Sequence, residues 1–155
     1  MIKGRVWPLP IQPADQIPVK IKVHTTIENG GEKETFELTT FGRYYVKNAS
    51  GYLQYEESTE EGPMKTTMKL TDDGILLMRS GSVKMRMLLE EQKQHRGSYT
   101  TPFGELLMIT DTKELQHRWN SESSIGTIEV LYDLSIQGSK AGTYKLQIVF
   151  EEEKR

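Results

Sequence analysis

Apolar and polar residues alternate with a period of two over most of the chain from Val19 onward. The alternation is clearest in residues 19–24, 36–39, 44–47, 53–56, 64–70, 128–136 and 144–151. Such a pattern is typical of β-strands with one face in a core and the other in water. No segment between them has the period of an amphipathic helix, so a parallel βαβ fold is excluded.

A turn is the second feature that fixes the topology. Residues 75–89 consist of two apolar strand-like runs around Ser80-Gly81-Ser82, where glycine can supply the backbone angle of a tight reversal. The other turns are equally short and follow one another along the chain, as in a meander. Closing a meander into a barrel removes its exposed edges. We therefore predict an all-β fold, an antiparallel up-and-down barrel of about eight to ten strands.

The length and the prolines suggest the domain organisation. A chain of 155 residues fits one domain, which we place at residues 18–155. Residues 1–17 contain Pro8, Pro10 and Pro13, which are incompatible with a helix interior. We interpret this segment as an extended Pro-rich arm on the domain or on a neighbouring subunit, with a frayed terminus as the alternative.

Composition excludes several classes of function. The chain has 20 Lys and Arg against 22 Asp and Glu, mixed along the sequence, whereas nucleic-acid binding needs basic residues concentrated on one face. No segment approaches the roughly 20 consecutive apolar residues of a membrane-spanning helix. Cysteine is absent, which excludes disulfides and thiol catalysis. The first residues lack the apolar core of an export signal. We predict a cytoplasmic protein that binds neither nucleic acid nor membrane.

No catalytic motif is present. The sequence lacks a Gly-rich phosphate loop, a zinc pattern of paired Cys or His, and a Gly-any-Ser-any-Gly nucleophile motif. The three histidines, His24, His95 and His117, lie at scattered positions, and we interpret them as surface residues. Residues 90–97 read as a polar loop at one barrel end. We predict no catalytic residue, no metal and no cofactor.

The candidate ligand-binding residues are Tyr44, Tyr55, Glu57, Arg79 and Lys84. Tyr44 lies an even number of residues from Leu38, and Tyr55 lies two residues from Leu53, so each shares a strand face with an apolar residue. Both rings should therefore point inward. The Arg79 guanidinium is a rigid fork of donors suited to a carboxylate or phosphate. Three alternatives stay open for Arg79: it anchors a ligand inside the barrel, it pairs internally with Glu57, or it faces solvent.

Two functions from different classes follow. The first is a non-catalytic binding module that takes a small anionic or amphipathic ligand in or at the barrel. The second is a protein-interaction or structural module with a solid core. Residues 76–78 and 106–109 are apolar on both strand faces and need a cover, so we also expect a homo-oligomer.

Four segments resemble the YwiB-like family, a bacterial family of uncharacterised function. They are residues 44–47 (Tyr-Tyr-Val-Lys), 52–57 (Tyr-Leu-Gln-Tyr-Glu-Glu), 78–85 (Met-Arg-Ser-Gly-Ser-Val-Lys-Met) and 103–105 (Phe-Gly-Glu). The resemblance covers residues 18 to 150 in order, and residues 78–85 are its most specific part. It implies a calycin-like barrel, the group of the lipocalins, and it implies no activity.

Overall fold

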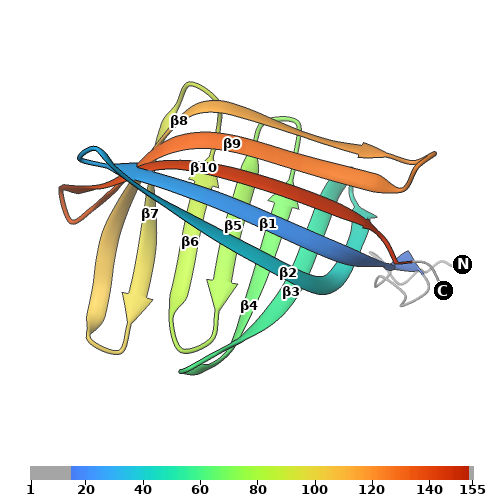
Figure 1. Cartoon of the computed structure of the whole chain (residues 1–155), viewed down its shortest axis with the longest axis horizontal. Coiled ribbons are helices and arrows are strands. Elements are labelled where there is room, and N and C mark those ends of the chain that lie inside the picture. The colour runs from blue at the N-terminus through green and yellow to red at the C-terminus, as the bar shows by residue number, and fades with distance from the viewer. Residues whose placement is uncertain (1–14, 154–155) are drawn as a thin grey trace, which may run out of the picture.

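Ten antiparallel strands close into a single barrel in the computed structural model, which describes residues 15–153 (Figure 1). Each strand pairs with its neighbours along the chain, and the barrel closes where β1 pairs with β10. This confirms the predicted fold class. The strands are β1 (Ile17–Asn29), β2 (Glu32–Lys47), β3 (Ser50–Thr59), β4 (Gly62–Leu70), β5 (Ile75–Ser80), β6 (Lys84–Leu89), β7 (Gln94–Thr101), β8 (Gly104–Asn120), β9 (Ile125–Ile136) and β10 (Ser139–Glu152).

The connections fall at two ends of the barrel, because consecutive strands run in opposite directions. The β1–β2, β3–β4, β5–β6, β7–β8 and β9–β10 turns lie at one end, which we call the hairpin end; it faces left and down in Figure 1. The remaining turns, the start of β1 and the finish of β10 lie at the other, the terminal end. The β5–β6 turn includes Gly81 at a positive φ of 153°, as its sequence predicted.

The predicted N-terminal arm lies largely outside the described residues. Of its residues 1–17, the structure describes Asp15, Gln16 and Ile17. Ile17 already belongs to β1, where it is registered opposite Tyr44. Gln16 accepts a hydrogen bond at Oε1 from Arg43 Nη1 at 3.0 Å. The barrel therefore begins one residue before the boundary that we predicted.

The terminal half of the barrel is filled by close-packed side chains. Tyr44, Trp119 and Phe150 form an aromatic plug, with ring centroids 4.6 Å apart for Tyr44 and Trp119 and 5.2 Å apart for Tyr44 and Phe150. The Phe150 ring also covers Gly126, where an added Cβ atom would collide with the ring. Glycine at this position therefore makes room for the plug. Fully buried aliphatic residues surround it, including Val19, Ile21, Leu53, Ile128 and Ile148.

The long strand β8 belongs to two parts of the barrel. Its first half pairs with β7, and the register with β9 shifts between Thr112 and Glu114, which marks a β-bulge. Beyond this point the β6–β7 connection covers the edge of β8: Thr112 N–H donates to Lys93 C=O at 3.1 Å, and Gln92 N–H donates to Thr112 C=O at 2.8 Å.

A turn at residues 101–104 separates β7 from β8, and in it Thr101 Oγ1 accepts from Phe103 N–H at 3.1 Å. One detail differs from the sequence prediction. The predicted polar loop at residues 90–97 is shorter, because β7 already begins at Gln94. His95 is therefore a strand residue, and its ring contacts the Glu90 carboxylate. The sequence pattern missed this strand because its residues are mostly polar.

Candidate functional site

A cavity of about 280 Å³ lies inside the barrel in the half nearer the hairpin end. Its walls come from the inner faces of nine strands, all except β2. The lining residues are Val23, Thr25, Tyr55, Thr66, Met68, Leu77, Arg79, Met85, Met87, Tyr99, Met108, Tyr132, Leu134, Ile136, Tyr144 and Leu146. Most of this surface is aliphatic, aromatic or thioether, and Arg79 is its one ionised side chain. The interior of this barrel is therefore only partly filled.

Arg79 occupies an inward position because it shares parity with Ile75 and Leu77 on β5. Its Nη2 donates to Glu57 Oε1 at 2.7 Å, and its Nε donates to Thr66 Oγ1 at 3.2 Å. The register explains the second contact, since Thr66 and Arg79 stand directly opposite each other on β4 and β5. Of the three alternatives for Arg79, the geometry shows the internal pair with Glu57. A role as a ligand anchor stays a prediction.

The ion pair marks the place where the cavity meets solvent. The side chains of Arg79 and Glu57 are 36% and 23% exposed, whereas Thr66 is fully buried. Hydrogen bonds within the described residues use Nε and Nη2 of Arg79 and Oε1 of Glu57. Nη1 of Arg79 and Oε2 of Glu57 therefore keep hydrogen-bonding capacity at the mouth of the cavity.

Tyrosine and threonine hydroxyls provide the other polar groups of the wall. Burial raises the pKa of Tyr55, and the nearby Arg79 charge and the Thr66 hydroxyl offset part of that rise. Burial also raises the pKa of Tyr132 well above its ordinary value. The ring of Tyr132 stacks on Tyr144 with centroids 5.3 Å apart. These phenols stay protonated at neutral pH, so they can donate as well as accept hydrogen bonds.

Four methionines, Met68, Met85, Met87 and Met108, line the same cavity. Methionine is unbranched and polarizable, so its side chain can adjust to ligands of different shape. Rearrangement of these thioethers can change the shape of the cavity without moving a strand.

The structure brings together three of the five predicted site residues. Tyr55, Glu57 and Arg79 meet at the mouth of the cavity. Tyr44 points inward as expected, but it belongs to the aromatic plug at the terminal end. Lys84 is exposed on the outer face of β6, because the inner face at this point is taken by its neighbour Met85. Lys84 therefore does not line the cavity, although it borders an outer hollow that Arg79 also lines.

Sequence reasoning missed Thr66, Tyr99, Tyr132 and Tyr144 as site residues. The signal was available in part, since Tyr132 shares the parity of Val130 and Leu134, and Thr66 shares that of Met64 and Met68. Parity identifies the inner face and carries no information about depth, so it could not separate cavity residues from residues of the filled half.

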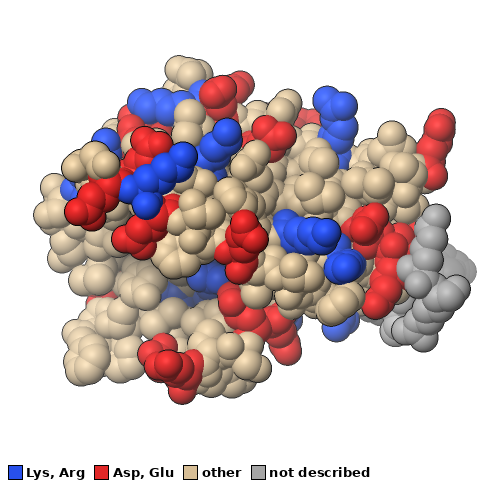
Figure 2. Space-filling model, in the orientation of Figure 1, with Lys and Arg blue, Asp and Glu red and all other residues tan. Residues whose placement is uncertain are grey.

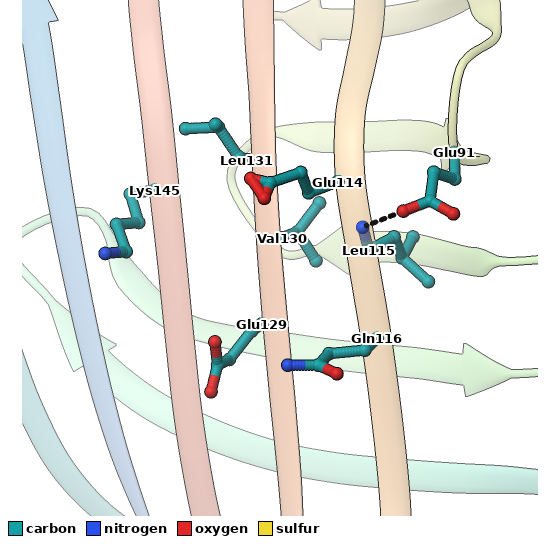
Figure 3. A pocket seen from close by; sticks show the side chains of 8 residues that line it. All are labelled: Glu91, Glu114, Leu115, Gln116, Glu129, Val130, Leu131 and Lys145. Carbon is teal, nitrogen blue, oxygen red and sulfur yellow. Dashed lines mark hydrogen bonds between the residues drawn. The ribbon is translucent and has the colours of Figure 1, made fainter.

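A second, larger hollow of about 510 Å³ lies on the outer surface beside the β8 bulge (Figure 3). Its residues are Glu91, Glu114, Leu115, Gln116, Glu129, Val130, Leu131 and Lys145. The charged side chains are exposed, and Figure 3 shows them spread along the strands without converging. Glu91 Oε2 accepts a hydrogen bond from Leu115 N–H at 3.3 Å, which satisfies a backbone group next to the bulge. We assign this hollow a structural role.

The outer surface carries no block of one charge on the face seen in Figure 2, where acidic and basic side chains are interspersed. The expected outer apolar face is also interrupted. Met78 stands opposite Arg86, and Ile109 stands opposite Arg96. The exposed apolar residues of this region are Leu107, at 37%, and Phe103, at 99% on the tip of the β7–β8 hairpin.

Self-association stays a prediction, and we now place it at the β7–β8 hairpin. A fully exposed phenylalanine next to an exposed leucine is a favourable contact for a second copy of the chain. We expect light scattering at high micromolar concentration to give a dimer or larger, and Leu107→Glu to shift the mass towards the monomer. Thr100→Glu, on the same outer face, is the matched control. A monomeric parent protein would contradict the prediction.

Within residues 15–153, no helix has the length and hydropathy needed to cross a membrane.

Comparisons with known proteins give the same fold and a family. Residues 21–148 match the family model described as "Domain of unknown function (DUF1934)". The chain is 33% identical over 136 residues to the uncharacterized beta-barrel protein YwiB of Bacillus subtilis (strain 168), covering 88% of this chain and 94% of that protein. The crystal structure of the ywiB protein from Bacillus subtilis superimposes with a TM-score of 0.82 at 32% identity, over 90% of this chain and 94% of that one. The chain therefore belongs to the YwiB-like family of β-barrel proteins with the DUF1934 domain, which confirms the resemblance seen in its sequence.

Proposed function

We propose that this protein is a non-catalytic binding module that takes a small amphipathic molecule into the barrel, with its polar head at Arg79 and Glu57. The observation that carries the proposal is a half-open interior cavity whose wall is mostly apolar, with a few tyrosine and threonine hydroxyls and one charged pair. Pockets with mostly apolar walls and a few convergent polar groups are the usual sites for small molecules.

The size of the cavity limits the ligand. A volume of about 280 Å³ is just below the range of roughly 300–1,000 Å³ that is common for ligand pockets. Long acyl chains would not fit without extending into solvent. A short alkyl chain or one aromatic ring would contact Leu77, Leu134 and the four cavity methionines, which supplies the apolar part of the binding free energy.

The alternative is a protein-interaction module, and the observation in its favour is the fully exposed Phe103. The two proposals differ in the residues that contact the binding partner. A small ligand would contact the cavity, whereas a protein partner would contact the outer surface. The cytoplasmic location and the likeness to lipocalins stay predictions.

Methyl nuclear magnetic resonance tests the binding proposal directly. In protein labelled with ¹³C at the methionine methyls, we expect 4-phenylbutanamide at millimolar concentration to shift the signals of Met68, Met85, Met87 and Met108. The signal of Met78, on the outer face of β5, should stay in place and serves as the internal control.

A blocking variant locates the site further. Met85 lines the mouth of the cavity and is half-buried, so a larger side chain can be accommodated there. We expect Met85→Trp to abolish the shifts at Met87 and Met108, whereas Met78→Trp on the outer face should leave them unchanged. Absence of shifts at every cavity methionine, across amide, alcohol and carboxylate probes, would refute a ligand-binding function.

A further inference from the structure

We propose that the Glu57–Arg79 pair makes this site selective for a neutral ligand head that both donates and accepts hydrogen bonds, as a primary amide does, over a carboxylate on the same skeleton. The inference rests on the proposed function and narrows its ligand class. An isolated arginine would favour an anionic ligand. Here Glu57 already binds the same guanidinium, and its negative charge changes that preference to a neutral ligand.

The charges at the mouth argue against an anion. Glu57 Oε1 lies 2.7 Å from Arg79 Nη2, so the arginine is already neutralised by a carboxylate. A ligand carboxylate on the remaining face of the guanidinium would lie close to Glu57, and like charges that share one site repel. A third charge would also remain uncompensated in a partly desolvated position, which is costly.

Other charged groups do not relieve this repulsion. Among the residues that line the cavity, Arg79 is the one cation. Arg79 also borders an outer hollow lined by Lys65, Lys84 and Arg86. These three side chains are exposed on the outer face of β4 and β6, where solvent screens their charges. Burial raises the pKa of Tyr144 in the cavity wall, and the charge of Glu34 on β2 adds to that rise. The cavity wall therefore offers a ligand carboxylate no second cation.

The free hydrogen-bonding groups at the mouth favour a ligand head group that both accepts and donates hydrogen bonds. Arg79 Nη1 has N–H groups to donate, and Glu57 Oε2 can accept, since hydrogen bonds within the described residues use Nη2, Nε and Oε1. An amide offers a carbonyl oxygen to the arginine and an N–H to the glutamate. A carboxylate has no proton to offer to Glu57 Oε2, and its negative charge would instead repel that oxygen.

The experiment compares 4-phenylbutanamide with 4-phenylbutyrate at pH 7.5 by titration of the cavity methionine signals. In the parent protein we expect the amide to bind at least tenfold more tightly than the carboxylate. Glu57→Gln keeps the size of the side chain and removes its negative charge. In that variant we expect the ratio to move by at least tenfold towards the carboxylate.

The matched control is Glu56→Gln, the same change on the neighbouring residue, whose side chain points to solvent on the outer face of β3. This control should leave the ratio within about twofold of the parent, as expected for an exposed and screened charge. Equal binding of amide and carboxylate by the parent protein, or an unchanged ratio in Glu57→Gln, would overturn the inference while leaving ligand binding intact. Failure of both probes to shift any cavity methionine would overturn the proposed function together with the inference.

Discussion

Replacing Phe150 with alanine should lower the free energy of unfolding by about 3–5 kcal/mol, the usual cost of removing a buried phenylalanine ring. Phe150 is 1% exposed and contacts both Tyr44 and Trp119 in the aromatic plug. The neighbouring core is tightly packed, so collapse around the lost ring would be incomplete. Denaturant unfolding measures the change, and the melting temperature should fall by roughly 10 °C or more for a chain of this length.

Val149 provides the control for this prediction. It is adjacent in β10 and points to the outer face, so Val149→Ala should cost about 1 kcal/mol or less. A loss of under about 1 kcal/mol for Phe150→Ala would contradict the role of the plug.

A double variant isolates the contact between Phe150 and Gly126. A methyl group at Gly126 would collide with the Phe150 ring, so Gly126→Ala alone should destabilise the barrel. In the Phe150→Ala background the same methyl group enters vacated space, and its cost should largely disappear. Additive losses in the double variant would show that the two positions do not share this space.

The second large effect is expected at the ion pair. Arg79→Ala should lower stability by about 2 kcal/mol, less than for a fully buried pair because both side chains are partly exposed. The Glu57 carboxylate loses its partner, and the fully buried Thr66 hydroxyl loses the donor at Arg79 Nε. The measurement is thermal or denaturant unfolding of Arg79→Ala, Glu57→Ala and the double variant.

The double variant should recover part of the loss, since no charge is then left unpaired. Arg86→Ala, an exposed arginine on the outer face of β6, is the matched control and should change stability by no more than about 0.5 kcal/mol. If Arg79→Ala changed the free energy of unfolding as little as Arg86→Ala, the Glu57–Arg79 pair would not contribute to stability.

The sequence by itself determined most of the strands, apart from the polar start of β7, and the face that most of their apolar side chains take. The alternation around Leu53 and Tyr55 placed these residues inward. For Arg79 the sequence left open whether the side chain faces the interior or solvent. Turn residues around Gly81 defined the β5–β6 hairpin. These features are local, because a strand reverses its side-chain direction at every residue and a tight turn is encoded within a few positions.

The tertiary structure alone decided which inward residues meet and whether space is left between them. Tyr44 and Tyr55 both point inward, yet one packs in the plug and the other lines the cavity, because strand register and tilt set the depth of each residue. The partnership of Arg79 with Thr66 depends on how β4 and β5 are aligned. The cavity itself is what remains after side chains from nine strands have been packed, a sum over distant residues that no local pattern contains.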